Sequence, residues 1–117
     1  PFEDLLRTSD FITLHVPAQK KPVIGAEEIE KMKTGAALVN TSRGGIVDEI
    51  ALVKALESGK LSFAALDVFV SEPNPEIQLL MQSKLSMSPH IGASTLEAQQ
   101  RIGEELAQQV IRLLQPQ

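Results

Sequence analysis

Arg43, Glu72 and His90 are the residues whose side chains could act together in one chemical step. Arginine presents a planar fork of hydrogen-bond donors that matches a carboxylate at two points. Histidine exchanges a proton near neutral pH, and a carboxylate such as that of Glu72 can orient its ring. This set suits the interconversion of a 2-hydroxy acid and a 2-keto acid, with the hydride carried by a nicotinamide.

Each polar candidate also has an ordinary structural explanation. A single arginine after a strand, like Arg43, is usually a surface salt-bridge partner, and a glutamate before a proline, like Glu72, is usually a loop residue. His15 and His90 could both be core histidines with satisfied hydrogen bonds, an interpretation that we keep for His15. Asp67 interrupts an apolar run, where a carboxylate is costly unless it is hydrogen-bonded, and it could cap a helix. The joint placement of these residues favours a functional site over the separate explanations.

Alternating apolar runs and helical patterns determine where these residues lie. The apolar runs lack polar alternation, which is typical of parallel strands covered on both faces. We predict strands over residues 11–16, 36–40, 63–69 and 85–88. We predict helices over residues 3–9, 26–33 and 49–58, a helical turn over 76–82, and a long helix from 94 to 114. This order predicts an α/β fold in which helices cover both faces of a parallel sheet.

Two helices carry clear end signals. Asp48 is a good N-cap for the third helix, and Gly59 ends it. Residues 94–97, Ser-Thr-Leu-Glu, form a predicted capping box for the last helix, which should end before Pro116. That helix carries an apolar stripe made of Leu96, Ile102, Leu106, Val110 and Leu113.

Ligands of open α/β sheets bind beyond the carboxyl ends of the strands. His15, Arg43, Asp67, Glu72 and His90 all lie at or after the ends of predicted strands. We therefore expect the five side chains to line one edge of the sheet and to converge on one crevice.

Composition and charge exclude several classes of function. The net charge of −4, without a basic cluster, argues against a nucleic-acid partner. No apolar run approaches the roughly eighteen residues of a membrane span. The absence of cysteine excludes disulfides and thiolate metal sites, so we predict no metal site and a reducing, cytoplasmic location. At 117 residues the chain has enough sequence for one domain.

Four segments of the chain resemble one known family. One carries Arg43 within Asn-Thr-Ser-Arg-Gly-Gly-Ile-Val-Asp, and another carries His90 within Ser-Pro-His-Ile-Gly-Ala-Ser-Thr. The four segments are residues 14–17, 38–49, 65–73 and 88–95. They resemble, in the same order, the motifs of the D-isomer-specific 2-hydroxyacid dehydrogenase family.

The resemblance implies a fold and residue roles. Residues 1–93 would form the C-terminal half of a Rossmann-like, doubly wound NAD-binding domain, and residues 94–117 a helix that crosses back to a substrate domain. Arg43 would hold the substrate carboxylate, His90 would be the general acid and base, and Glu72 would pair with His90. Asp67 would meet the nicotinamide carboxamide. The implied cofactor-binding residues are Val16, Thr41, Ser42, Arg43, Asp67, His90, Ile91, Gly92 and Ala93.

The resemblance also implies an activity and leaves alternatives open. Family members oxidise 2-hydroxy acids, or reduce 2-keto acids, with NAD and usually as dimers or tetramers. Residues 94–99 are most similar to the branch that acts on 3-phosphoglycerate in serine synthesis, whereas glyoxylate and hydroxypyruvate reductases share most other motifs. No G-x-G-x-x-G turn occurs in the sequence. We therefore expect the chain alone to be inactive, and the choice between NAD and NADP stays open.

Two other classes of function are weighed against the enzyme. A non-catalytic, dinucleotide-sensing or assembly module is one, but the complete set of Arg43, Glu72 and His90 favours the enzyme. A small flavodoxin-type regulator is the other, and it does not explain the motifs at residues 40–48 and 89–95.

Overall fold

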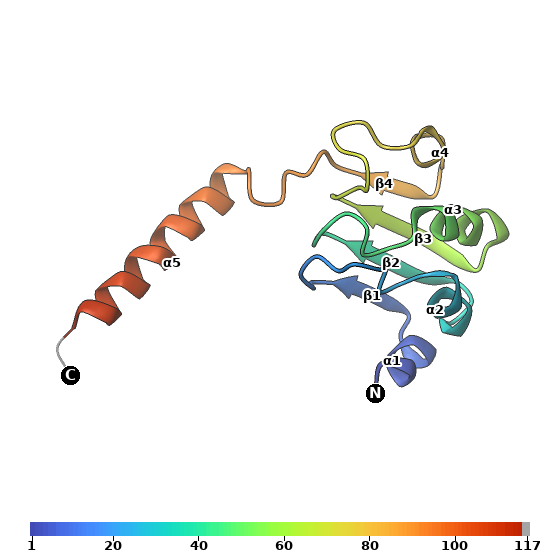
Figure 1. Ribbon diagram of the computed structural model, residues 1–117, viewed down its shortest axis with the longest axis horizontal. Coiled ribbons are helices and arrows are strands. Elements are labelled where there is room, and N and C mark those ends of the chain that lie inside the picture. The colour runs from blue at the N-terminus through green and yellow to red at the C-terminus, as the bar shows by residue number, and fades with distance from the viewer. Residues whose placement is uncertain (116–117) are drawn as a thin grey trace.

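Four parallel strands form a single sheet in the order β1-β2-β3-β4 (Figure 1). The computed structural model describes residues 1–115 of the chain. The strands are β1 (Phe11–Leu14), β2 (Ala36–Asn40), β3 (Leu61–Leu66) and β4 (Leu85–Met87). The last residues of all four are in register, because Leu14 pairs with Asn40, Asn40 with Leu66, and Leu66 with Met87. The loops that follow the strands therefore leave the sheet along one edge.

Helices lie before, between and after the strands in the predicted order, and their ends differ from the predictions by up to two residues. They are α1 (Phe2–Thr8), α2 (Ala26–Lys31), α3 (Glu49–Ser58), α4 (Ile77–Leu80) and α5 (Leu96–Leu114). The carboxylate of Asp48 caps α3 by accepting a hydrogen bond from the Ala51 N–H at 3.0 Å. Gly59 ends α3 at φ 78°, a backbone conformation that favours glycine.

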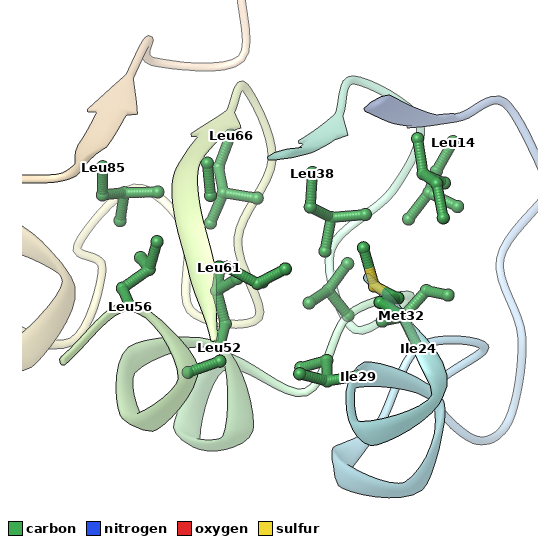
Figure 2. Packing of buried hydrophobic residues seen from close by; sticks show 14 of the residues in the cluster. Leu14, Ile24, Ile29, Met32, Leu38, Leu52, Leu56, Leu61, Leu66 and Leu85 are labelled. Carbon is green, nitrogen blue, oxygen red and sulfur yellow. The ribbon is translucent and has the colours of Figure 1, made fainter. Parts of the chain in front are cut away.

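The core lies between one face of the sheet and helices α1 to α4. Figure 2 shows Leu38 and Leu66 of the sheet above Leu52 and Leu56 of α3. The opposite face carries Phe11 and Phe63, which are 81% and 43% exposed. The expectation that helices cover both faces is therefore met on one face only within residues 1–115.

The last helix stands apart from the sheet. Figure 1 shows α5 separated from the remaining elements by the segment after β4, and none of its residues is buried. Its cap is Thr95, whose hydroxyl accepts from the Ala98 N–H at 3.1 Å, so the capping box predicted to start at Ser94 is wrong by one position. Pro116, expected to follow the helix, lies outside the described residues. No helix within residues 1–115 combines the length and the apolar character needed to cross a membrane.

Strand ends differ from the predictions by up to three residues, and the pairing partners explain why. β1 ends at Leu14 rather than Val16 because its partner β2 ends at Asn40. β3 covers 61–66 rather than 63–69, because its paired positions with β2 and β4 end at Leu66, followed by a hydrogen bond from the Asp67 N–H to the Asn40 carbonyl.

Candidate functional site

Glu72 and His90 meet beyond the ends of β3 and β4. Oε2 of Glu72 lies 2.8 Å from Nδ1 of His90, while its Oε1 accepts a hydrogen bond from the Phe69 N–H at 3.0 Å. These hydrogen bonds, the one with His90 first, hold the pKa of Glu72 below its usual value. The other ring nitrogen, Nε2, makes no hydrogen bond within residues 1–115. Because the ring is 45% exposed, Nε2 is available to exchange a proton with a ligand.

Asp67 holds the segment that carries His90. Its Oδ1 accepts from the Ser88 hydroxyl at 2.7 Å and from the Ile91 N–H at 2.9 Å, and its Oδ2 accepts from the Gly92 N–H at 3.0 Å. His90 itself has φ 57°, in the left-handed region that non-glycine residues rarely adopt. Asp67 thus hydrogen-bonds to residues before and after His90, whose own backbone is strained.

The pKa of Asp67 reflects two opposing causes. Burial makes ionisation less favourable, but the hydrogen bonds from Ser88, Ile91 and Gly92 outweigh it and hold the pKa of Asp67 below its usual value. The carboxylate is therefore ionised at neutral pH although the residue is only 6% exposed.

The loop with Arg43 is fixed by a residue that the sequence reasoning did not single out. The buried side chain of Asn40 accepts hydrogen bonds from the Ser42 N–H at 3.0 Å and from the Ser42 hydroxyl at 2.7 Å. Its amide donates to the Arg43 carbonyl at 3.0 Å. The exposed guanidinium of Arg43 donates to the Ser42 carbonyl at 2.6 Å and forms no ion pair within the described part of the chain. The explanation of Arg43 as a salt-bridge partner is therefore not supported within residues 1–115.

The structure brings some predicted residues together and leaves others apart. Glu72 and His90 are hydrogen-bonded to each other, and Asp67 bonds to the backbone just after His90, whereas Arg43 makes no hydrogen bond to any of the three. His15 is exposed and bonds to the Thr13 hydroxyl at 2.9 Å, so the core interpretation of His15 is wrong. It is exposed because it follows Phe11 and Thr13 on the uncovered side of β1.

The predicted cofactor-binding residues divide by exposure. Thr41, Ile91 and Ala93 are exposed, Ser42 is buried in the turn of Asn40, and Val16 packs against the core. An ionised carboxylate has about four lone-pair positions, and Asp67 uses three of them. One position on Oδ2 therefore accepts no hydrogen bond within residues 1–115.

A cavity of about 320 Å³ adjoins the Glu72–His90 pair. Its walls are largely apolar and come from Phe69, Leu80, Met87 and three prolines. Across residues 1–115, no group of three or more histidine, cysteine, aspartate or glutamate side chains is arranged to hold a metal ion.

Asn40 and Ser88 are site residues that sequence reasoning missed. Asn40 carries one usable signal, since it occupies a buried position at the end of an apolar run, where a polar side chain needs internal partners. Ser88 begins the segment that carries His90, but that position does not predict its contact with Asp67, which joins residues 21 positions apart.

The Glu72–His90 pair lies beyond the carboxyl ends of parallel strands, so the class of protein is an α/β domain that binds its ligand at this edge of the sheet. The chain belongs to the family described as D-isomer specific 2-hydroxyacid dehydrogenase, NAD binding domain, whose model matches residues 1–92.

Individual relatives agree with this family. D-3-phosphoglycerate dehydrogenase of Archaeoglobus fulgidus is 46% identical over 115 residues, which are 96% of this chain and 22% of that protein. Hydroxypyruvate reductase of Thermotoga maritima is 47% identical over 117 residues, which are 96% of this chain and 38% of that protein. A crystal structure of a glyoxylate reductase from Paecilomyes thermophila superimposes with a TM-score of 0.80 at 42% identity, covering 87% of this chain and 32% of that one. The chain thus spans between a fifth and two fifths of the length of these relatives.

Proposed function

We propose that this chain forms part of an NAD-dependent oxidoreductase that acts on the CH–OH group of a D-2-hydroxy acid. The observation that carries the proposal is the 2.8 Å contact between Glu72 and His90 in a chain of this family. A carboxylate fixed on Nδ1 orients the ring so that Nε2 faces a reacting hydroxyl, and it stabilises the imidazolium that forms when Nε2 accepts a proton.

Arg43 and His90 act directly on the substrate in the proposed reaction, and Glu72 acts through His90. The fork of Arg43 binds the substrate carboxylate, which fixes the position of the neighbouring C2 carbon. During oxidation the hydroxyl proton passes to Nε2 of His90, and the C–H electron pair leaves C2 as a hydride while the C=O bond forms. Bound NAD supplies the acceptor for that hydride. Reduction of the keto acid follows the same steps in reverse.

The cofactor would be held by residues along the carboxyl edge of the sheet. The free acceptor position on Asp67 suits the carboxamide, and the exposed Thr41 lies at the end of β2. The full proposed set is Val16, Thr41, Ser42, Arg43, Asp67, His90, Ile91, Gly92 and Ala93.

For the substrate we propose 3-phosphoglycerate, as in serine synthesis. Relatives named D-3-phosphoglycerate dehydrogenase, 42–47% identical to the chain, support this choice. Relatives named glyoxylate reductase and hydroxypyruvate reductase, 46% and 47% identical, support a reductase as the second candidate. Measuring kcat/KM for 3-phosphohydroxypyruvate, hydroxypyruvate and glyoxylate in the dehydrogenase decides between them. A clear preference for either unphosphorylated acid would contradict the first choice.

His90→Ala in the same dehydrogenase tests the function itself. General acid and base groups contribute roughly 10²–10⁴-fold, so kcat should fall by orders of magnitude while KM changes much less. Turnover within about twofold of the parent would exclude His90 as the acid and base.

The proposal also covers the role of α5, the oligomeric state and the location in the cell. The exposed apolar stripe of α5 supports its assignment as the connection to a substrate domain, with residues 1–93 forming the nucleotide-binding part. We propose a homo-oligomer in the cytoplasm, consistent with a chain that has no cysteine.

A further inference from the structure

The loop that carries Glu72 is attached to α3 through a second glutamate outside the proposed site. Glu49, the first residue of α3, accepts a hydrogen bond from the Val70 N–H at 2.7 Å through its Oε1. The preceding N–H, that of Phe69, donates to Glu72. Two successive N–H groups of this loop thus donate to two different glutamates, Glu49 at the start of α3 and Glu72 within the loop itself.

The peptide unit between Phe69 and Val70 is held at both of its ends. Its N–H points to Glu49, and its carbonyl oxygen lies so close to Gly44 that a Cβ added there would be 1.9 Å from it. Gly44 follows Arg43 in the loop after β2. A single peptide plane therefore connects the Arg43 loop, the start of α3 and the Glu72 loop.

Open space on one side of the loop makes the Glu49 contact important. A cavity of about 490 Å³ borders Glu49, Val70, Ser71 and Glu76, so packing does not fill the region into which the loop could shift. The neighbouring carboxylate of Asp48 accepts from the Ala51 N–H within α3 and makes no hydrogen bond to this loop. Within residues 1–115, the hydrogen bond to Glu49 is the one that the Val70 N–H makes.

We infer that Glu49 is a positioning residue, which fixes the peptide between Phe69 and Val70 and thereby sets the contact between Glu72 and His90. The catalytic meaning of this inference rests on the proposed function, whereas the geometric part does not. Glu49 acts through Glu72 and contacts neither the substrate nor the cofactor.

Nuclear magnetic resonance of the 117-residue chain tests the inference without an assay. The chain has two histidines, so the ring nitrogen shifts of His90 can be assigned, and they report which nitrogen carries the proton. Glu49→Ala removes the acceptor of the Val70 N–H. Glu49→Asp keeps the charge, but its side chain is one methylene shorter, whereas Glu49→Gln keeps an acceptor oxygen on a side chain of the same length. Glu57→Ala is the matched control, because Glu57 is exposed on the same helix.

We expect Glu49→Ala and Glu49→Asp to speed hydrogen exchange of the Val70 N–H by about tenfold, the loss of one hydrogen bond. In both variants the fraction of His90 protonated at Nδ1 should fall, since Glu72 no longer holds that proton in place. Glu49→Gln and Glu57→Ala should resemble the parent chain. If Glu49→Ala does not fold, Glu49→Asp decides.

Unchanged His90 signals in Glu49→Asp, despite faster exchange at Val70, would overturn the inference and leave Glu49 as a local support of the loop. The same signal change in Glu57→Ala would also overturn it. Failure of the proposed function is distinct, because it would leave turnover intact in His90→Ala and would not alter these spectra.

Discussion

Glu72 shows how a flexible side chain is fixed at the surface. A free glutamate loses up to about 2 kcal/mol of conformational entropy when it is held in one rotamer. Here the backbone N–H of Phe69 takes one carboxylate oxygen and directs the other toward His90. The loop therefore fixes the orientation of this carboxylate before a ligand arrives, which is the preorganisation that the proposed reaction would require.

Arg43 offers the most direct residue-scale test of the substrate-binding role. Arg43→Lys keeps the positive charge but loses the planar fork, so it should lower kcat/KM by tenfold or more, about 1.4 kcal/mol, in the dehydrogenase. The measurement is steady-state kinetics with the hydroxy acid varied, and Lys54→Ala, an exposed change on α3, serves as the control. If Arg43→Lys matches the parent, Arg43 does not clamp a carboxylate.

Asp67 should make the stability of the chain depend on pH. Its pKa is lowered in the folded state, so its contribution to stability is present above the ordinary aspartate pKa and is lost as the pH falls through the lower, folded value. Asp67→Asn should reduce this dependence by the part that Asp67 contributes, leaving the part due to Glu72, whose pKa is also lowered. The change should cost about 1–3 kcal/mol at neutral pH, because the Asn amide turns a donor toward N–H groups that donate to Asp67 in the parent chain. Urea unfolding between acidic and neutral pH measures both effects.

A control separates Asp67 from the other acids. Asp4→Asn changes the charge equally at an exposed site on α1 and should leave the pH dependence in place. Glu49 acts in the opposite direction, since burial raises its pKa above the ordinary glutamate value, and the carboxylates of Glu76 and Asp48 add to this effect. The contribution of Glu49 is present at low pH and is lost as the pH rises through its folded pKa. An unchanged profile in Asp67→Asn would contradict the assignment.

At the scale of the elements, the loop after β2 approaches the loop after β3 closely at Gly44. A Cβ there would lie 1.9 Å from the Phe69 carbonyl oxygen and 2.5 Å from its carbon, which no rotamer can relieve because both atoms are backbone. Gly44→Ala should therefore destabilise the chain by about 1–3 kcal/mol or more and displace the Glu72 loop. Thermal unfolding measures the stability.

Gly103→Ala is the matched control for this change. Gly103 lies within α5 with no atom near its missing Cβ, so alanine should be neutral or should favour the helix by about 0.5–1 kcal/mol. Equal stability of the Gly44→Ala chain and the parent would show that the two loops are not packed as the structure has them.

Local patterns suffice to predict all nine helices and strands within residues 1–115, because each apolar run or cap carries its own signal. The cap at Asp48 is confirmed, whereas Ser94 and Thr95 are adjacent and equally suitable caps, so local chemistry could not choose Thr95. The strand ends depend on the register of pairing between neighbouring strands, so they cannot be predicted from the residues of one strand alone.

The site is predictable to the extent that its parts are local. The approach of Glu72 and His90 follows from two loops on one edge of the sheet, and the structure confirms that the two residues meet. The contacts of Asp67 with Ser88 and of Glu49 with Val70 each join residues 21 positions apart. They depend on the three-dimensional arrangement of loops, which neither periodicity nor composition encodes.

At the scale of the whole molecule, the chain has apolar surface that its own residues do not cover. One face of the sheet exposes Phe11 and Phe63, α5 exposes its apolar stripe, and β1 pairs with a neighbour on one side only. An edge strand with unpaired N–H and C=O groups and apolar side chains readily accepts a strand from another molecule.

The 117-residue chain by itself should associate and should bind NAD much more weakly than the proposed dehydrogenase does. In doubly wound folds a glycine-rich turn at a helix N-terminus receives the pyrophosphate, and the sequence contains no G-x-G-x-x-G. The most highly charged part of the cofactor would lack its oriented backbone donors. Titration calorimetry measures NAD binding, and sedimentation measures association.

Phe11→Lys tests whether β1 mediates the association. A lysine at this edge position, where Phe11 is 81% exposed, should oppose strand pairing and shift the chain toward the monomer. Ile50→Lys makes the same chemical change at a 64% exposed position on α3 and should leave association unchanged. A parent chain that is monomeric and binds NAD at micromolar concentrations would show that its residues suffice for the site, and that neither the glycine turn nor a partner at β1 is needed.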